Sequence, residues 1–272
     1  MILSDLNAAL RNLFRHNGSE LAGYIAYTAL VSLFPFTIFL FAVAGFFREE
    51  LLAQNLLSRI MSALPAQVAD TLLPIARDIL SGKQPTLLTV GALGTLWATF
   101  TGVEALRLAL NRAYETHATR PIWKRYAEDA FIVIAAAVTG LLASALIVAA
   151  PLILQPLQQH GILLPGAIRG LNLGRYLLTY FLLTLFLSAA YKLLPALRQR
   201  WRRVLPGALL ASAVWLLLAT LFSLYLAYFN RYNLTYGSLG GVVITLLFMQ
   251  LSAMIFIFGA EFNAAGSRAA NS

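Results

Sequence analysis

Long apolar runs, separated by short polar segments, make up most of the chain. The last of these runs, from Val242 to Ala260, holds 19 residues without a single charge. At about 1.5 Å of rise per residue, a helix over this run is roughly 28 Å long, close to the thickness of the hydrocarbon core of a bilayer. The pattern therefore predicts a transmembrane helix, which we place at 238–265.

Five earlier runs have a similar length and apolar character, and they predict further membrane-spanning helices. The expected fold class is all-α, a polytopic membrane helix bundle that forms a single integral domain over residues 1–272. Pro35 lies inside the first run and is expected to kink that helix. The six predicted transmembrane helices are 21–47, 87–114, 127–154, 176–194, 204–229 and 238–265.

Two other segments alternate apolar and polar residues at helical spacing. Residues 1–20 predict an amphipathic lead that lies on the cytoplasmic surface of the membrane. Residues 48–84 carry charges of both signs and are interrupted by Pro65 and Pro74. They predict short amphipathic helices in the first extracytoplasmic loop instead of another crossing.

The composition is that of a membrane protein. Apolar residues make up 60% of the chain and charged residues 11%, whereas a soluble domain carries about 25% charged residues. The formal net charge is +9, but the basic residues lie between apolar runs instead of on a polar domain. We therefore expect membrane lipids, and not nucleic acid, as partners. Cysteine is absent, which excludes disulfides, thiolate metal sites and cysteine nucleophiles.

The distribution of basic residues predicts the orientation of the spans. With the N-terminus in the cytoplasm, thirteen Lys and Arg residues fall on the cytoplasmic side and seven on the opposite side. We therefore expect both termini to lie in the cytoplasm.

The second predicted span carries polar residues among its apolar ones. Glu104 and Arg107 are three residues apart and can pair, and charges inside a span are expected to line a cavity or to be buried with a partner. Asn111 and Arg112 follow a turn later. Arg112 is interpreted either as a contact for an anionic headgroup or as a positive-inside anchor.

Glu261 and Asn263 end the last apolar run. Glu261 is interpreted either as a polar substrate or proton site reached from the cytoplasm, or as the structural partner of a basic residue at the headgroup level. Because the second and sixth spans end on the same side, we expect Glu261 to contact Arg107 or Arg112, directly or through water. The expected lining of an adjoining cavity is Tyr24, Tyr27 and Glu104.

Small residues and a basic run complete the candidate features. Gly94, Ala98 and Gly102 predict a face that another helix approaches closely. Pro35, Gly240 and Gly241 are candidate hinges, and close packing is the alternative explanation for them. The run RQRWRR at 198–203 is interpreted as a headgroup contact or as a topology signal. Its arginines are Arg198, Arg200, Arg202 and Arg203.

Motifs that would indicate an enzyme are missing from the sequence. His16, His117 and His160 are far apart and outside any metal-ligand spacing. No GxxxxGK[ST] motif is present to cradle a nucleotide phosphate, and GxSxG is absent. We therefore expect no catalytic residues, no metal and no cofactor, and no ATP hydrolysis by this chain.

Four segments together resemble the YihY/BrkB family of bacterial inner-membrane proteins, formerly labelled ribonuclease BN. They are AYTALVSLFPF at 26–36, ALNRAYETHATRPIWKRY at 109–126, YKLLPALRQRWRRVLPGALLASAVW at 191–215 and YGSLGGVVITLLFMQLSAMIFIFGAEFNA at 236–264. The resemblance covers nearly the whole chain. It implies six transmembrane helices, a bacterial inner-membrane location and a role in envelope integrity or export. Some members of the family are linked to lipid or lipopolysaccharide precursors, and others to serum resistance.

Three hypotheses for the function follow. The first is a non-ATPase transporter or flippase-like protein for an anionic or amphipathic envelope molecule. The second is a structural scaffold that supports envelope integrity and moves nothing. The third, a ribonuclease, rests only on the former family label. A homo-oligomer or an assembly with other envelope proteins is compatible with the first two hypotheses.

Overall fold

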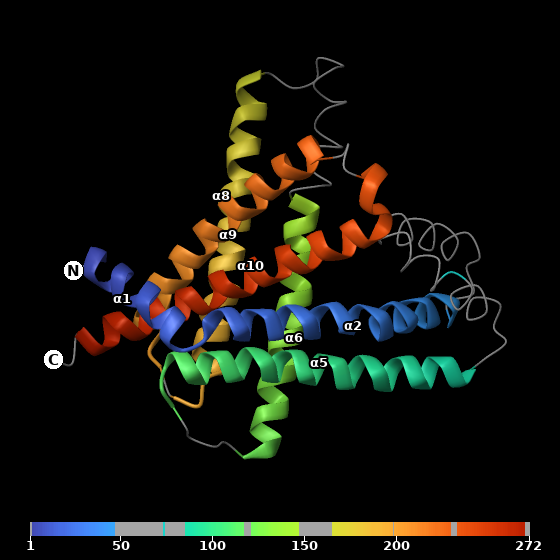
Figure 1. The fold of residues 1–272 in the computed structure, drawn as a ribbon, viewed down its shortest axis with the longest axis horizontal. Coiled ribbons are helices and arrows are strands. Elements are labelled where there is room, and N and C mark those ends of the chain that lie inside the picture. The colour runs from blue at the N-terminus through green and yellow to red at the C-terminus, as the bar shows by residue number, and fades with distance from the viewer. Residues whose placement is uncertain are drawn as a thin grey trace. The chain divides into compact units, whose positions relative to one another are not determined.

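The computed structural model of the chain describes residues 2–46, 73, 85–116, 121–146, 165–197, 199–229 and 233–269. These residues form α-helices and their connections, with no strand among them, so the expected all-α class is confirmed (Figure 1). In chain order the helices are α1 (Ile2–Arg15), α2 (Gly18–Phe46), α5 (Pro85–Ala113), α6 (Ile122–Ser144), α8 (Pro165–Leu193), α9 (Trp201–Phe229) and α10 (Asn233–Ala269).

Within the described residues, four helices contain stretches that are long and apolar enough to cross a membrane. These stretches are Ile122–Ala143 in α6, Leu173–Leu193 in α8, Trp201–Leu226 in α9 and Gly240–Arg268 in α10. They coincide with four of the six predicted spans. The other two predicted spans, 21–47 and 87–114, coincide with α2 and α5, and the total of six remains a prediction.

The helix boundaries differ from the predicted spans at several ends. α8 starts at Pro165, eleven residues before the predicted 176, because proline is well suited to the first turn of a helix. α1 ends at Arg15, and a two-residue turn leads into α2. The predicted extracytoplasmic segment 48–84 lies outside the described residues, apart from residue 73, and so does the C-terminal end of the span predicted at 127–154.

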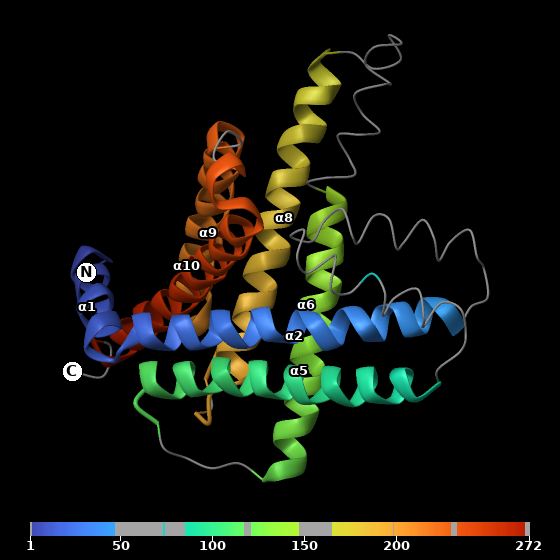
Figure 2. The ribbon, with the colours of Figure 1, turned by 45° about the vertical axis from the view of Figure 1, so that its right-hand side comes forward.

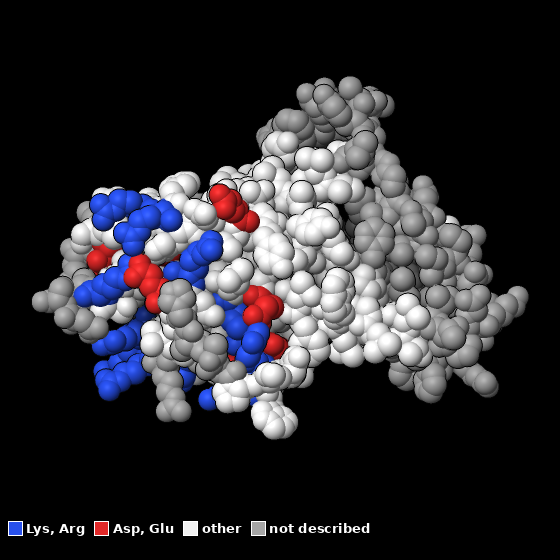
Figure 3. All heavy atoms as spheres, turned by 60° about the horizontal axis from the view of Figure 1, so that its bottom comes forward, with Lys and Arg blue, Asp and Glu red and all other residues white. Residues whose placement is uncertain are grey.

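The chain divides into two compact units. The first unit comprises 1–18, 107–220 and 254–272, and the second comprises 19–106 and 221–253. Helices α5, α9 and α10 each contribute residues to both units. Among the charged residues whose side chains are described, only Glu20 and Glu104 belong to the second unit. Lys, Arg, Asp and Glu side chains gather together on part of the surface seen in Figure 3.

In the second unit, α2 and α5 run side by side in both ribbon views (Figures 1 and 2). Pro35 lies inside α2, and a Cβ atom on Gly94 of α5 would be 3.0 Å from the Pro35 Cβ. Ala98 is buried, whereas a Cβ on Gly102 would meet nothing within 4 Å. The close approach predicted from these small residues therefore occurs at Gly94 and not at Gly102.

Helices α8, α9 and α10 pack closely against one another in the first unit. The Tyr191 hydroxyl of α8 donates a hydrogen bond of 2.8 Å to the Phe256 carbonyl of α10, and the two rings lie 5.1 Å apart. A Cβ on Gly259 would be 2.8 Å from both the Gly207 carbonyl oxygen and the Ala211 Cβ. The glycines thus allow the α9 and α10 backbones to touch.

Candidate functional site

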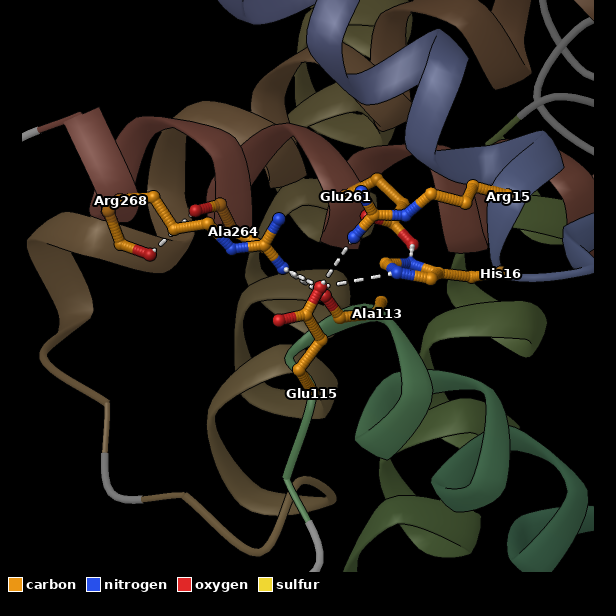
Figure 4. A network of polar contacts seen from close by, with 8 residues as sticks. Arg15, His16, Ala113, Glu115, Glu261, Ala264 and Arg268 are labelled. Carbon is orange, nitrogen blue, oxygen red and sulfur yellow. Dashed lines mark hydrogen bonds and ion pairs between the residues drawn. The ribbon is translucent and has the colours of Figure 1, made fainter.

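Glu261 is the most deeply buried acid among the described residues. Its side chain, near the C-terminal end of α10, is 0% exposed. The Glu261 Oε1 atom lies 2.6 Å from Nδ1 of His16, which occupies the turn between α1 and α2 (Figure 4). A buried carboxylate requires a hydrogen-bond partner, and the imidazole supplies one.

This pairing replaces the one that we expected from the sequence. The expected partners of Glu261 were Arg107 and Arg112, but Arg107 donates to Asp129 of α6 instead, and Arg112 is exposed. The physical reason is that Glu128 and Asp129, in the second turn of α6, lie close to Arg107, while the amphipathic lead brings a histidine to Glu261. The sequence analysis had considered His16 only as a metal ligand.

The other nitrogen of His16 also faces a carboxylate. Its Nε2 atom lies 3.3 Å from Oε1 of Glu115, in the turn after α5. Two guanidinium groups reach the same Glu115 oxygen, Arg15 Nη2 at 3.1 Å and Arg268 Nη2 at 3.1 Å (Figure 4). Arg268 also donates to the Ala113 carbonyl at 3.4 Å. The ends of α1, α5 and α10 are therefore joined by one charged cluster.

Asn263 ties α10 to the first turns of α9. Its Oδ1 atom accepts a hydrogen bond of 2.7 Å from the Gly207 backbone N–H, and its Nδ2 donates to the Val204 carbonyl at 2.9 Å. Pro206, inside α9, has no N–H of its own. The candidate residue Asn263 thus satisfies backbone groups of a neighbouring helix.

Tyr114, in the turn after α5, is half-buried with a buried hydroxyl, and its sequence context did not single it out. Its hydroxyl lies close to Asn263 and Gln199, but forms no hydrogen bond of good geometry. Gln199 Nε2 and Glu261 Oε2 are likewise buried without a hydrogen-bond partner in the described structure. Three unsatisfied polar groups therefore lie in this part of the first unit.

A second buried ionic site surrounds Arg107, which is 5% exposed. Its Nη2 donates to the Asp129 carboxylate, its Nη1 donates to the Leu194 carbonyl at 3.0 Å, and Glu128 Oε2 lies 3.6 Å from Nη1. Asp129 is 4% exposed. Arg107 is thus buried beside acids of α6, and its place in the lining of a cavity stays a prediction.

The remaining candidates lie as follows. Asn111 Oδ1 accepts a hydrogen bond of 3.0 Å from the Ala196 N–H. Pro35, Gly240 and Gly241 lie inside the continuous helices α2 and α10, and their role as hinges stays a prediction. Exposed candidates are Tyr24, Tyr27, Glu104, Arg200, Arg202 and Arg203, and the side chain of Arg198 lies outside the described residues. In the described ranges, no group of three or more His, Cys, Asp or Glu residues is placed to hold a metal ion.

The positions of His16, Glu115, Glu128 and Asp129 in the sequence indicate that these residues have polar partners. His16 and Glu115 both lie in polar turns on the predicted cytoplasmic side, where Glu261 also ends its span. Glu128 and Asp129 stand together at the start of an apolar run, and acids in that position require cationic partners.

Comparison with known proteins gives a consistent result. The chain is 29% identical to a putative ribonuclease-like protein, YfkH, of Bacillus subtilis, over 92% of this chain and 90% of that protein. It is 27% identical to a UPF0761 membrane protein of Alteromonas mediterranea, over 89% of this chain and 80% of that protein. A UPF0761 membrane protein of Chromohalobacter salexigens is also 27% identical, over 96% of this chain and 62% of that protein. No solved structure matches the chain significantly.

A family description matches almost the full length. The Virulence factor BrkB family matches residues 9–272, which include every helix from α2 to α10 and both buried ionic sites. With its long apolar helices, the chain is a membrane protein and belongs to the Virulence factor BrkB family.

Proposed function

We propose that this protein is a non-ATPase transporter or flippase-like protein of the bacterial inner membrane, which moves an anionic or amphipathic envelope molecule. The observation that carries the proposal is the burial of Glu261, a carboxylate with one unpartnered oxygen, inside a helix long and apolar enough to span a membrane. Ionisable groups in such positions are costly and usually serve a pathway for substrates or protons.

The surroundings of Glu261 support a polar pathway over a purely structural pair. His16 satisfies one carboxylate oxygen, and Tyr114 and Gln199 add further unsatisfied polar atoms nearby. A group that served packing alone would be expected to have all its hydrogen bonds made. Membrane lipids are the partners that this proposal requires.

Transport by the purified protein is the test of this function. We expect the full chain, reconstituted in liposomes, to move a fluorescent phosphatidylglycerol between leaflets, measured with a membrane-impermeant quencher. Glu261→Gln removes the charge but keeps the shape, and should slow transport about tenfold to a hundredfold, the worth of a hydrogen bond to a charged group. Glu20→Gln, at an exposed position of α2, is the matched control and should transport normally.

Two outcomes would contradict the proposal. The first is that Glu261→Gln transports at the native rate. The second is that the native protein moves no lipid while it retains its fold, which would favour the scaffold hypothesis.

The topology that the proposal assumes, six spans with both termini in the cytoplasm, is tested separately. Because the chain has no cysteine, single cysteines can be introduced at chosen positions. Cysteines at Gln54 and Gln158 should react with an impermeant thiol reagent added outside intact spheroplasts, because they lie in predicted extracytoplasmic segments. A cysteine at the exposed Arg200 should react only after lysis. The opposite labelling pattern would reverse the orientation.

A further inference from the structure

Two guanidinium groups and an imidazole converge on a single oxygen atom. Arg15 Nη2, Arg268 Nη2 and His16 Nε2 lie 3.1, 3.1 and 3.3 Å from Glu115 Oε1. They come from the end of α1, the end of α10 and the turn between α1 and α2, as Figure 4 shows. One carboxylate oxygen is thus contacted by nitrogen atoms from two separate parts of the first unit, the junction of α1 and α2 and the end of α10.

The backbone at Glu115 is unusual for a glutamate. α5 ends with hydrogen bonds from Glu115 N to the Arg112 carbonyl, 3.1 Å, and from Thr116 N to the Asn111 carbonyl, 2.9 Å. This is the Schellman arrangement, in which the residue at the position of Glu115 adopts a left-handed conformation and is usually glycine. Glu115 has a φ of 49°. A side chain in such a strained position is a reason to look for a functional role.

The position of the carboxylate suggests that role. The side chains of Glu115, Arg15 and Arg268 are 48%, 62% and 41% exposed. The cluster is therefore open on one side, and Glu115 can leave it. A phosphate group carries several acceptor oxygens, so it can serve three donors separately, where Glu115 offers them one shared atom.

We infer that Arg15, His16 and Arg268 form a binding site for a phosphate monoester or diester, and that Glu115 is its exchangeable internal occupant. When Glu115 swings out, Arg15 and Arg268 lose the carboxylate that they share, and an incoming phosphate restores the balance of charge. The inference rests on the proposed function in one respect only, which is that the phosphate belongs to the transported molecule.

The test measures binding without transport. The full chain in neutral detergent is titrated with inorganic phosphate by isothermal titration calorimetry, with chloride at equal ionic strength as the reference. In a second arm, mixed micelles that contain phosphatidic acid and phosphatidylcholine are used, and the lipid retained after size exclusion is quantified by mass spectrometry. The first arm reports a free phosphate, and the second reports a lipid headgroup.

Glu115→Gly is the decisive variant, because glycine suits the left-handed position and the end of α5 should fold normally. We expect this variant to bind phosphate or phosphatidic acid at least about tenfold more tightly than the native chain, since the competing carboxylate is gone. Adding Arg15→Gln or Arg268→Gln to it should abolish that gain. Adding Arg11→Gln, at an exposed arginine of α1, should leave the gain unchanged.

The outcomes separate this inference from the proposed function. A gain in either arm that depends on Arg15 and Arg268 supports the site, whether or not liposomes show transport. Equal binding by native chain and Glu115→Gly in both arms overturns it. A gain that persists without the two arginines overturns it as well, because the bound anion then lies elsewhere. Thermal unfolding of each variant shows whether its fold is intact.

Discussion

Replacing Gly259 with alanine should destabilise the protein strongly, although alanine is the better helix former. The added Cβ would come within 2.8 Å of the Gly207 carbonyl and of the Ala211 Cβ, and closer still to the Tyr191 hydroxyl. The Gly207 carbonyl is part of the α9 backbone, and the Ala211 Cβ is bonded directly to it. Neither can move aside on its own, so the α9 and α10 helices must separate. Overpacking of this kind costs about 1–3 kcal/mol or more, enough to exceed the gain of up to about 1 kcal/mol in helix propensity.

A matched control lies two turns further along the same helix. A Cβ on Gly266 would meet nothing within 4 Å, so Gly266→Ala should be neutral or slightly stabilising. The measurement is the thermal unfolding midpoint in detergent, followed by the loss of the monodisperse size-exclusion peak. Similar midpoints for the two alanine variants would show that α9 and α10 are not in backbone contact at Gly259.

Replacing Arg107 with leucine should have an effect at least as large. Asp129, which is 4% exposed, would lose the hydrogen bond that the Arg107 guanidinium donates to it. The Leu194 carbonyl would lose its hydrogen bond from the same group. Removing one partner of a buried ion pair costs about 3–5 kcal/mol because it leaves a buried charge without compensation. The unfolding midpoint, or the yield of folded protein, measures this loss.

A double variant distinguishes the ion pair from a general effect of mutation. Arg107→Leu combined with Asp129→Leu should be less harmful than the sum of the two single changes, because the stranded carboxylate is removed as well. The rescue should be partial, since Glu128 remains near the site. Arg112→Leu, at an exposed position of the same helix, should change stability by no more than about 0.5 kcal/mol. Strict additivity of the two single changes would show that the two side chains do not interact.

The helices were predictable because length and apolar character decide them locally. A run such as 242–260 can satisfy its backbone in a membrane only as a helix, so its position follows from a short stretch of sequence. The burial of certain polar residues was also predictable, since Glu261, Asn263 and Arg107 are polar groups in apolar stretches of sequence. Their burial at 0%, 4% and 5% exposure agrees with that reasoning.

The partners of these residues were not predictable by the same reasoning. His16 is 245 residues away from Glu261, and Asp129 is 22 residues from Arg107 across a polar turn. Helical periodicity relates residues three or four apart and says nothing of which helix ends meet. The orientation of the spans limits the partners of each acid to residues on one side of the membrane. Several basic side chains on that side are able to pair with each acid. Choosing among them requires the packing of α1, α5 and α10.

The two bonds from the Asn263 amide also limit how α9 and α10 can move against each other inside the first unit. Sliding either helix along its axis would separate the amide from Gly207 N–H and the Val204 carbonyl, and each unsatisfied buried group costs about 1–3 kcal/mol. Within the first unit, Asn263 therefore fixes the register of α10 along α9.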